Sequence, residues 1–288
     1  MMIFIVNPVA GNGYAELVKK RLQDEMAIRA LPYAFWYTSG PGHATVLAAE
    51  AAATPDCTAV ISVGGDGTSY EVACGLIGTK IPLGIIPAGT GNDFIKSTGT
   101  PKDPIAALEY ILSTKPRPVD VGSINDRLFL NVSGTGFDVT VLDYTLAAKK
   151  YMRGIFPYLV GLVRAVAHNK KVHLRLTVDG KTEEKDVLLC TVANGRFIGG
   201  GIPICPVAQI DDGKLDVVVA DVVPRWKIPF YLPGLLMGRI LGFDITRHRL
   251  CDCAVLECPG MRVNVDGEIF SMDKAEFRVQ PDSLMLYW

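Results

Sequence analysis

A strand that ends in a glycine-rich turn constrains the fold of this chain more than any other feature. The β-forming run Val60–Val63 leads directly into Gly64–Thr68, which reads Gly-Gly-Asp-Gly-Thr. The residues that follow, Thr68–Ala73, predict a helix opening with Thr68 or Ser69 as its N-cap. A strand that delivers such a turn to a helix N-terminus is typical of phosphate binding, because glycine lets the backbone approach an anion and the helix N–H groups point at it.

The aspartate inside this turn, Asp66, adds a second requirement. A carboxylate beside a phosphate indicates that a cation such as Mg²⁺ lies between the two. The alternative is a tight turn between strand and helix that binds nothing. Three glycines and a threonine around one aspartate favour the phosphate site over that alternative.

Composition excludes several classes of protein. The chain has 288 residues, enough for one large domain or two, and its net charge of −1 without any basic tract argues against a nucleic-acid partner. Its mean hydropathy is high, at +0.26, yet no apolar run approaches the ~18 residues of a membrane span. The start, Met1–Val6, has no basic segment or cleavage site, so we expect a buried strand there and not a signal peptide.

Seven cysteines without an export signal indicate reduced thiols and a cytoplasmic protein. Cys251, Cys253 and Cys258 cluster in the sequence, but they lie on a strand-like segment and lack a partner Cys-x-x-Cys pair. We therefore expect no zinc at this cluster.

Strands alternate with helices over the first part of the chain. Strands are predicted at 3–6, 33–37, 60–63 and 83–86. Helices are predicted from the spacing of Leu17, Val18, Leu22 and Met26, and at 44–53 and 69–77. This order predicts a doubly wound parallel α/β domain. The polar loops 7–13, 38–42, 64–68 and 87–93 each follow a strand, so they gather at the sheet edge where ligands bind. Neither a P-loop nor a dinucleotide-binding glycine motif is present.

The pattern changes near residue 120 and becomes strand-rich. Strands are predicted at 127–132, 172–178, 186–193, 214–220, 254–257, 262–265, 276–279 and 284–287, with helices at 139–149 and 156–169. The period-2 alternation of apolar and polar residues, together with the Asp179-Gly180 turn, indicates antiparallel hairpins. The sequence thus predicts an α/β two-domain protein: a nucleotide-binding α/β domain over 1–120, completed by a returning strand at 280–288, and an antiparallel β-sandwich domain over 121–279.

Two acidic turns in the second part carry candidate chemistry. Asp211–Lys214 and Val265–Glu268 each contain an Asp-Gly pair, and each, taken alone, is equally well explained as a hairpin turn. A kinase, however, needs a base near its acceptor hydroxyl and carboxylates for Mg²⁺.

Taken together, these motifs resemble the diacylglycerol kinase catalytic-domain family of lipid kinases, which includes soluble bacterial diacylglycerol kinases, YegS-like kinases and sphingosine kinases. The motifs that carry the resemblance are Asn7-Pro8 with Gly11, residues 64–68, Pro-Ala-Gly-Thr-Gly-Asn-Asp at 87–93, residues 131–138, Asp-Gly-Lys-Leu-Asp at 212–216 and Asp-Gly-Glu at 266–268. The resemblance implies an ATP- and Mg²⁺-dependent kinase that transfers the γ-phosphoryl group to a hydroxyl of diacylglycerol or a related lipid.

The resemblance also implies site residues. The nucleotide would be bound by Asn7, Pro8, Gly11, Thr38, Gly64, Gly65, Asp66, Gly67, Thr68, Ser69, Tyr70, Thr90, Gly91 and Asn92. Glu268 would be the general base, with Asp266 beside it and Asp66 as a third catalytic carboxylate. A structural Mg²⁺ would be held by Asp212 with main-chain oxygens of Gln209 and Lys214, and Asp93 would join a metal network near the phosphates.

The chain departs from the family pattern at two positions of the nucleotide loops. Tyr70 stands where asparagine is usual, and Asn12 stands where lysine is common. Each change acts toward weaker nucleotide binding. Neither removes a carboxylate, so we expect an active kinase.

The stretch Trp226–Met237 is the most apolar of the chain and is broken by prolines, so it predicts a surface that lies on a membrane, with Arg225, Lys227 and Arg239 toward lipid headgroups. A buried helix is the equal alternative. Tyr151–Val166, with Arg153 and Arg164, is expected to be core. The expected protein is cytoplasmic and peripheral to the membrane, its partner is a lipid substrate, and a homodimer is one assembly to test.

Two other functions stay open at this point. One is a kinase of a soluble substrate, above all NAD, because the nucleotide loops are shared in outline with NAD kinases. The other is a protein that binds nucleotide or lipid without turnover, supported only by Tyr70 and Asn12.

Overall fold

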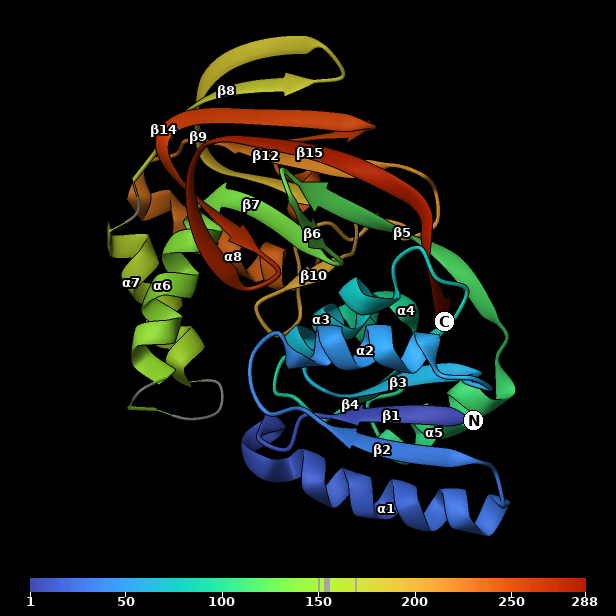
Figure 1. Cartoon of the computed structure of the whole chain (residues 1–288). Coiled ribbons are helices and arrows are strands. Elements are labelled where there is room, and N and C mark those ends of the chain that lie inside the picture. Colours follow the sequence, from blue (N-terminus) through green and yellow to red (C-terminus); the bar gives the residue numbers. More distant parts are fainter. Residues whose placement is uncertain (150, 153–155, 169) are drawn as a thin grey trace. The chain divides into compact units, whose positions relative to one another are not determined.

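The computed structural model describes residues 1–149, 151–152, 156–168 and 170–288, and of residue 149 the backbone only. The chain divides into two compact units (Figure 1). The first comprises Met1–Val121 and Pro281–Trp288, and the second comprises Gly122–Gln280. Two strands, β5 (Pro116–Ile124) and β15 (Glu268–Tyr287), run from one unit into the other.

The first unit is built from short alternating elements. In chain order these are β1 (Met2–Val6), η1 (Ala10–Gly13), α1 (Tyr14–Arg29), β2 (Tyr33–Tyr37), α2 (His43–Ala53), β3 (Ala59–Gly64), α3 (Asp66–Leu76), β4 (Leu83–Pro87), α4 (Phe94–Thr98) and α5 (Pro104–Ser113).

The sheet of this unit is parallel throughout, in the order β2-β1-β3-β4, and the end of β15 adds a further parallel strand through Leu286 against Leu83. All five residues of β1 are buried, as expected for a central strand covered on both faces. Met2, Phe4 and Val6 pack with α1 and α5 in one core cluster. The helices α2 and α3 cover the other face (Figure 1). The predicted doubly wound α/β fold is thereby confirmed.

Local details of this unit differ from the sequence expectations. The helix after the glycine turn, α3, begins at Asp66 with Gly65 as its N-cap, so Thr68 and Ser69 lie inside the helix and are buried. Ser69 Oγ contacts Ser62 Oγ at 3.1 Å instead of capping. Leu17 is 59% exposed and is not part of the core face of α1.

The second unit consists mainly of longer strands. Besides β5 and β15, its elements are β6 (Arg127–Phe129), β7 (Val132–Gly136), α6 (Phe137–Lys149), α7 (Phe156–His168), β8 (Val172–Val178), β9 (Lys181–Ala193), β10 (Phe197–Ile198), β11 (Ile202–Pro203), β12 (Leu215–Asp221), η2 (Arg225–Lys227), α8 (Ile228–Leu236), η3 (Ile240–Gly242), β13 (Thr246–Cys251) and β14 (Cys253–Val265).

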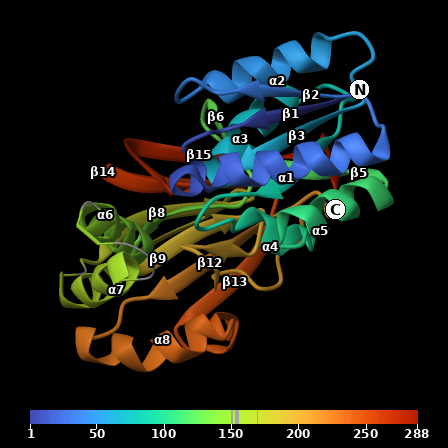
Figure 2. The same cartoon turned by 90° about the horizontal axis from the view of Figure 1, so that it is seen from below.

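The strands of the second unit pair antiparallel in the order β13-β12-β9-β7-β14-β15, and β8 bridges β9 and β14. The pairings β8–β9–β7–β14–β8 form a closed circuit around an apolar core that contains Leu176, Val217 and Phe277. The opposite face of β9 and β12 is covered by α6, α7 and α8 (Figure 2). This arrangement confirms the predicted antiparallel sandwich.

Several expectations for the second unit were wrong. The expected strand at 127–132 is divided into β6 and β7, while the pairs 254–257 with 262–265 and 276–279 with 284–287 are parts of the continuous strands β14 and β15. Part of the expected core stretch Tyr151–Val166 is exposed, since Phe156 and Val163 are 62% and 69% accessible. Arg153 and Asn169 lie outside the described residues.

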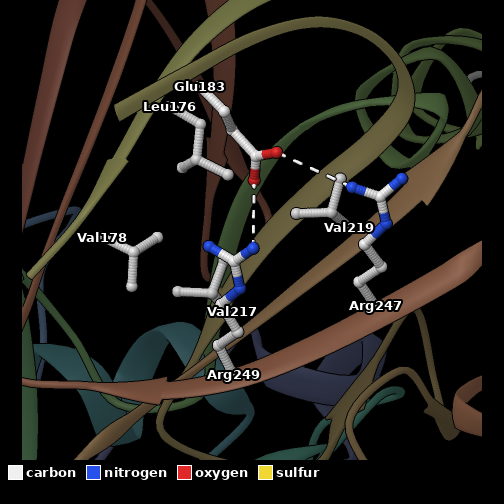
Figure 3. A pocket seen from close by; sticks show the side chains of 7 residues that line it. All are labelled: Leu176, Val178, Glu183, Val217, Val219, Arg247 and Arg249. Atoms are coloured by element: carbon white, nitrogen blue, oxygen red, sulfur yellow. Dashed lines mark ion pairs between the residues drawn. The ribbon is translucent and has the colours of Figure 1, made fainter. Parts of the chain in front are cut away.

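The strand β13 was not predicted, because the consecutive polar residues Arg247, His248 and Arg249 interrupt the alternation of apolar and polar residues that is typical of a strand. It is an edge strand, and charged side chains protect such edges from pairing with other chains. Figure 3 shows Arg247 and Arg249 each paired with a different carboxylate oxygen of Glu183, with a nitrogen–oxygen distance of 3.6 Å in both pairs. The hollow between them measures about 10 Å³, room for at most about one water molecule. It is a strand edge held by ion pairs and not a ligand site.

Candidate active site: glycine loops and an acidic turn

Backbone hydrogen bonds tie the four predicted loops of the first unit together at the carboxyl ends of its strands. Thr38 N–H donates to Val6 O at 3.0 Å, Asn7 N–H to Val63 O at 3.1 Å, and Ala88 N–H to Gly64 O at 2.7 Å. The structure therefore brings Asn7, Thr38, Gly64 and Pro87 to one edge, as the sequence predicted. Pro8, Gly11, Thr90 and Gly91 lie on the same loops.

Three of these loops approach one another so closely that only glycine fits at the contacts. A Cβ on Gly89 would lie 2.3 Å from Gly65 Cα, and a Cβ on Gly11 would lie 2.3 Å from Ala88 O. Such contacts are sterically impossible for any other residue without a shift of backbone. The glycines therefore allow three loops to meet, in addition to any role in admitting an anion.

The side chain of Asn7 joins the first loop to the first turn of α3. Its Nδ2 donates to Thr68 Oγ1 at 3.0 Å, and its Oδ1 accepts the Val9 N–H at 3.3 Å. Thr68 is only 6% exposed. Both residues were predicted to bind nucleotide, which stays a prediction; in the structure their side chains join the first loop to α3.

Asp66 has a role that the sequence did not reveal. Its Oδ1 accepts the N–H groups of Asp93 and Phe94, at 2.6 and 3.1 Å, and so holds the loop that opens α4. Desolvation and the nearby Asp93 carboxylate raise the pKa of Asp66, against the effect of these two hydrogen bonds and of Lys96. A cation at this place would remove the penalty for the ionised form.

Asp93 stands beside Asp66 and is 8% exposed. Lys96 Nζ donates to Asp93 Oδ1 at 2.5 Å and to Gly91 O at 2.9 Å. A Cβ on Gly91 would lie 2.9 Å from Asp66 Oδ2 and 3.9 Å from Asp93 Oδ2, so both carboxylates border Gly91. Gly91 O and Asp93 Oδ1 are bound by Lys96, whereas Asp66 Oδ2 and Asp93 Oδ2 at Gly91 are carboxylate oxygens of the kind that suits Mg²⁺. The residues present therefore fit the ion that the motif implies.

The remaining predicted nucleotide residues line the same edge. Asn92, at φ 48°, closes its loop by donating Nδ2 to Gly89 O at 2.8 Å and accepting the Gly89 N–H. Thr90 and Gly67 are exposed, and Tyr70 is half-buried. Their predicted contacts with nucleotide stay predictions.

Sequence reasoning missed Glu71, which organises the loop 38–42. Its two carboxylate oxygens accept the N–H groups of Gly42 and Ala44, at 2.9 and 3.1 Å, and so cap the N-terminus of α2. Gly42 provides no side chain for this purpose, which is the one sequence signal that a cap must come from elsewhere.

In the second unit, the predicted acidic turn connects β14 and β15. Asp266 and Gly267 both have positive φ, 46° and 96°, as in the tight two-residue hairpins that favour Asp-Gly. The Asp266 carboxylate accepts the backbone N–H groups of Leu130, Asn131 and Val132, at 2.6, 3.0 and 3.0 Å. Such triple acceptance makes Asp266 a structural acceptor that fixes the turn on residues 130–132, where β7 begins.

Glu268 follows at the first position of β15 and is exposed. A chain of hydrogen bonds supports the turn that carries it: Gly267 N–H donates to Asn264 Oδ1 at 2.8 Å, and Asn264 Nδ2 donates to Asp138 Oδ2 at 3.3 Å. Burial raises the pKa of Asp138 to about 6. An exposed carboxylate on a supported turn is suited to accept a proton from a bound substrate.

The third predicted site is the turn at Asp212. Gly213 has φ +69°, and Asp212 Oδ1 accepts the Lys214 N–H at 3.0 Å. Gln209 and Asp212 are exposed, while Lys214 Nζ is paired with Asp252 Oδ1 at 2.7 Å. One exposed carboxylate on a loop suits a hard cation that keeps several waters, so the Mg²⁺ prediction stands as a prediction.

The apolar stretch Trp226–Met237 forms η2 and α8, and much of it is exposed. Trp226, Phe230 and Met237 are 66%, 76% and 64% accessible, whereas Ile228 is buried. The alternative of a fully buried helix is thus wrong. No helix among those the structure describes is long and apolar enough to cross a bilayer.

The chain thus joins a parallel α/β unit with glycine loops to an antiparallel unit with an Asp-Gly-Glu turn. Comparison with known proteins gives the family. Residues 1–124 match the diacylglycerol kinase catalytic domain, and residues 131–288 match the YegS C-terminal NAD kinase beta sandwich-like domain. The chain belongs to this family of lipid kinases.

The chain is similar over nearly its whole length to named members of the family. It is 31% identical to a diacylglycerol kinase of Mycobacterium tuberculosis, over 98% of this chain and 93% of that protein. It is 34% identical to a probable YegS-like lipid kinase of Pseudomonas putida, over 85% and 82%. A solved structure from Bacillus anthracis, described as a candidate diacylglycerol kinase, superposes with a TM-score of 0.85 at 28% identity, covering 100% of this chain and 94% of that one.

Proposed function

We propose that this protein transfers the γ-phosphoryl group of Mg²⁺-ATP to a hydroxyl group of diacylglycerol or a related lipid. The observation that carries the proposal is the junction of the glycine loops at Gly65 and Gly89, bordered by the carboxylates of Asp66 and Asp93. Backbone amides there suit the phosphates, and the two carboxylates suit the metal that accompanies them.

Each group has a defined task in this proposal. Mg²⁺, when bound, neutralises charge on the phosphates. Asp66 holds the loop at Asp93 and Phe94, so that the amides at the strand ends stay aimed at the phosphates. Glu268 accepts the proton of the lipid hydroxyl as the new P–O bond forms and the bond to the leaving ADP breaks. Asp266 keeps that glutamate in place through its three N–H partners.

The deciding experiment is a transfer assay with labelled ATP and Mg²⁺, run in parallel on diacylglycerol in mixed micelles and on NAD. Labelled phosphatidic acid from the first reaction supports the proposal. Labelled NADP from the second alone would instead establish the soluble-substrate alternative. ATP binding without product on a panel of lipids would establish a binding protein without turnover.

We further propose that η2 and α8 rest on the membrane that supplies the lipid. Exposed Trp226 and Phe230 pack edge to face, with ring centroids 6.4 Å apart, and Lys227 Nζ lies 5.5 Å from the Trp226 ring. Aromatic and apolar side chains with basic neighbours are typical of interfacial helices. Phe230→Ser with Trp226→Ser should reduce sedimentation with anionic vesicles; Val9→Ser, at an equally exposed apolar residue of the first unit, is the matched control.

For the turn at Asp212 we propose the structural Mg²⁺. Asp212→Ala should lose one bound divalent ion per chain and lower the melting temperature of the Mg²⁺-loaded protein. Metal content and melting temperature equal to wild type would leave Asp212 as a turn residue, without affecting the proposal for transfer.

A further inference from the structure

The described residues contain one cluster of mixed metal-binding side chains, and none of its members belongs to the acidic turn or is a predicted ligand at Asp212. Cys205, Asp216 and His248 each present a ligand atom, and these atoms all lie within 4.8 Å of one another. Asp216 is on β12, and His248 is on the neighbouring strand β13, where it faces Val218. Cys205 comes from the loop that joins β11 to β12.

Strand register explains why these three meet. Val218 and Ala220 belong to the apolar cluster under α8, and Asp216, two residues earlier on the same strand, points to the same face. Cys205 is a member of that cluster. The loop that carries Cys205 is fixed by its own backbone, since Cys205 N–H donates to Arg196 O and Ala208 N–H donates to Cys205 O, both at 3.2 Å.

The carboxylate of Asp216 is the unusual member of this cluster. Its side chain is 2% exposed, and Oδ1 contacts His248 Nε2 at 2.5 Å. Among the described residues, its Oδ2 is a buried oxygen without a hydrogen-bond partner. Leaving a buried carboxylate oxygen unsatisfied costs free energy on the order of 1–3 kcal/mol. The Cys205 thiol already hydrogen-bonds to this carboxylate, and a cation shared by the two groups would also satisfy Oδ2.

We propose that Cys205, Asp216 and His248 bind a zinc-like divalent cation. One sulfur, one nitrogen and one oxygen donor select Zn²⁺ or Co²⁺ over Mg²⁺, which prefers oxygen alone. Tetrahedral zinc places its ligand atoms roughly 3.2–3.8 Å apart, so small side-chain movements within the present spacing suffice. The side chain of His248 is 28% exposed, so water can reach the ion there and occupy the fourth position of its tetrahedral coordination.

Binding of the ion requires its ligands to be in the deprotonated or neutral form. The Cys205 thiol loses its proton to bulk water, and His248 binds the ion as a neutral imidazole through Nε2, with its ring proton on Nδ1. Without an ion, burial and the Asp216 charge raise the pKa of the Cys205 thiol, so Cys205 is not a reactive nucleophile. The ion would tie the loop 204–214, which also carries Asp212, to β12 and β13.

The test is zinc binding by the full-length protein after removal of metals with a chelator. Wild type should retain one Zn²⁺ per chain after dialysis, as measured by mass spectrometry of the metal. Cys205→Ser and His248→Gln should bind Zn²⁺ at least about tenfold more weakly. Cys251→Ser is the matched control, because Cys251 is a buried cysteine of β13 that packs in the other core cluster.

Cobalt provides a second readout that does not depend on activity. Co²⁺-loaded wild type and Cys251→Ser should show a thiolate-to-cobalt charge-transfer band in the near ultraviolet, and Cys205→Ser should lack it. His248→Gln, at a partly exposed position, keeps the test valid if Cys205→Ser does not fold. Equal zinc in wild type and His248→Gln, or cobalt without the thiolate band, would overturn the proposal and leave a hydrogen-bonded triad.

Discussion

Asp66 in the first unit and Asp266 in the second occupy similar places, yet their surroundings differ. Each lies in a glycine-containing turn after a strand, and each accepts backbone N–H groups from a distant segment. Asp66 accepts two such groups, and its pKa is raised by desolvation and by a neighbouring carboxylate, Asp93. Asp266 accepts three. The two aspartates therefore have different roles. Asp66 both holds a loop and contributes negative charge for a cation, whereas Asp266 only holds the turn that carries the exposed Glu268.

The largest effect is expected at Asp66. Asp66→Ala should abolish measurable turnover while the protein stays folded, because both the loop contact and the charge are lost. Asp66→Asn separates the two, since its amide oxygen still accepts the N–H groups of Asp93 and Phe94 but carries no charge. We expect Asp66→Asn to be inactive too, with a normal melting temperature. Near-normal kcat with Mg²⁺-ATP in Asp66→Ala would refute the nucleotide assignment.

At Asp266 the expected effect is on folding first. Asp266→Ala removes the acceptor of three backbone N–H groups, so the free energy of unfolding should fall by at least about 3 kcal/mol. The free energy of unfolding of Asp266→Asn should fall by less, because the amide oxygen of asparagine still accepts hydrogen bonds from these N–H groups. Urea unfolding of both variants measures this. A fully stable Asp266→Ala would make the two aspartates alike and return Asp266 to a direct role in the chemistry.

Asp138, which supports the Glu268 turn through Asn264, gives a prediction in pH. Burial raises its pKa from 3.8 to about 6, so the folded protein binds this proton more tightly than the unfolded chain. The resulting stability is fully present below pH 3.8 and is lost as the pH rises through 6. Relative to Asp138→Asn, wild type should therefore gain about 2 kcal/mol between pH 7 and pH 4. Urea unfolding of both proteins across this range checks the sign; parallel curves would mean that Asp138 does not titrate there.

The smallest effect is expected at Glu71, which caps α2 and shapes the loop at Thr38. Glu71→Gln keeps an acceptor for one of the two N–H groups, and loss of a cap typically costs about 1 kcal/mol. We expect KM for ATP to rise by up to about tenfold with kcat little changed. Fluorescence titration of ATP gives the affinity directly. A fall in kcat alone would place Glu71 in the chemistry and not in the loop.

Much of the first unit could be predicted from the sequence, because its signals are local. The apolar runs of its strands and helices, with the glycine turns between them, predicted the parallel sheet and the edge at which the loops meet. The helix start at Asp66 was missed, since Gly65 caps α3 without a side-chain hydrogen bond and the sequence pattern favours Thr68. The helix α5 was missed as well, although Asp103 caps it and Pro104 opens it.

The candidate sites were harder to predict from the sequence, because their contacts join residues that lie far apart along the chain. The Asp-Gly turn at 266–267 was readable, but its partners at 130–132 lie about 135 positions away. The cluster of Cys205, Asp216 and His248 depends on the register between β12 and an edge strand that polar residues conceal. Exposure of α8 also required the structure, since an apolar run with prolines fits a core helix and a surface helix equally well.

The central claim, that the aspartates organise the turns and Glu268 takes the proton, is tested most directly by kcat and ATP affinity of Glu268→Gln. A lipid hydroxyl must lose its proton as the phosphoryl group is transferred, and general-base catalysis is worth roughly 10²–10⁴ in rate. We predict that Glu268→Gln lowers kcat on diacylglycerol by about that factor, with ATP affinity little changed. Full kcat in Glu268→Gln together with an inactive, stably folded Asp266→Asn would reverse the two roles and contradict the account.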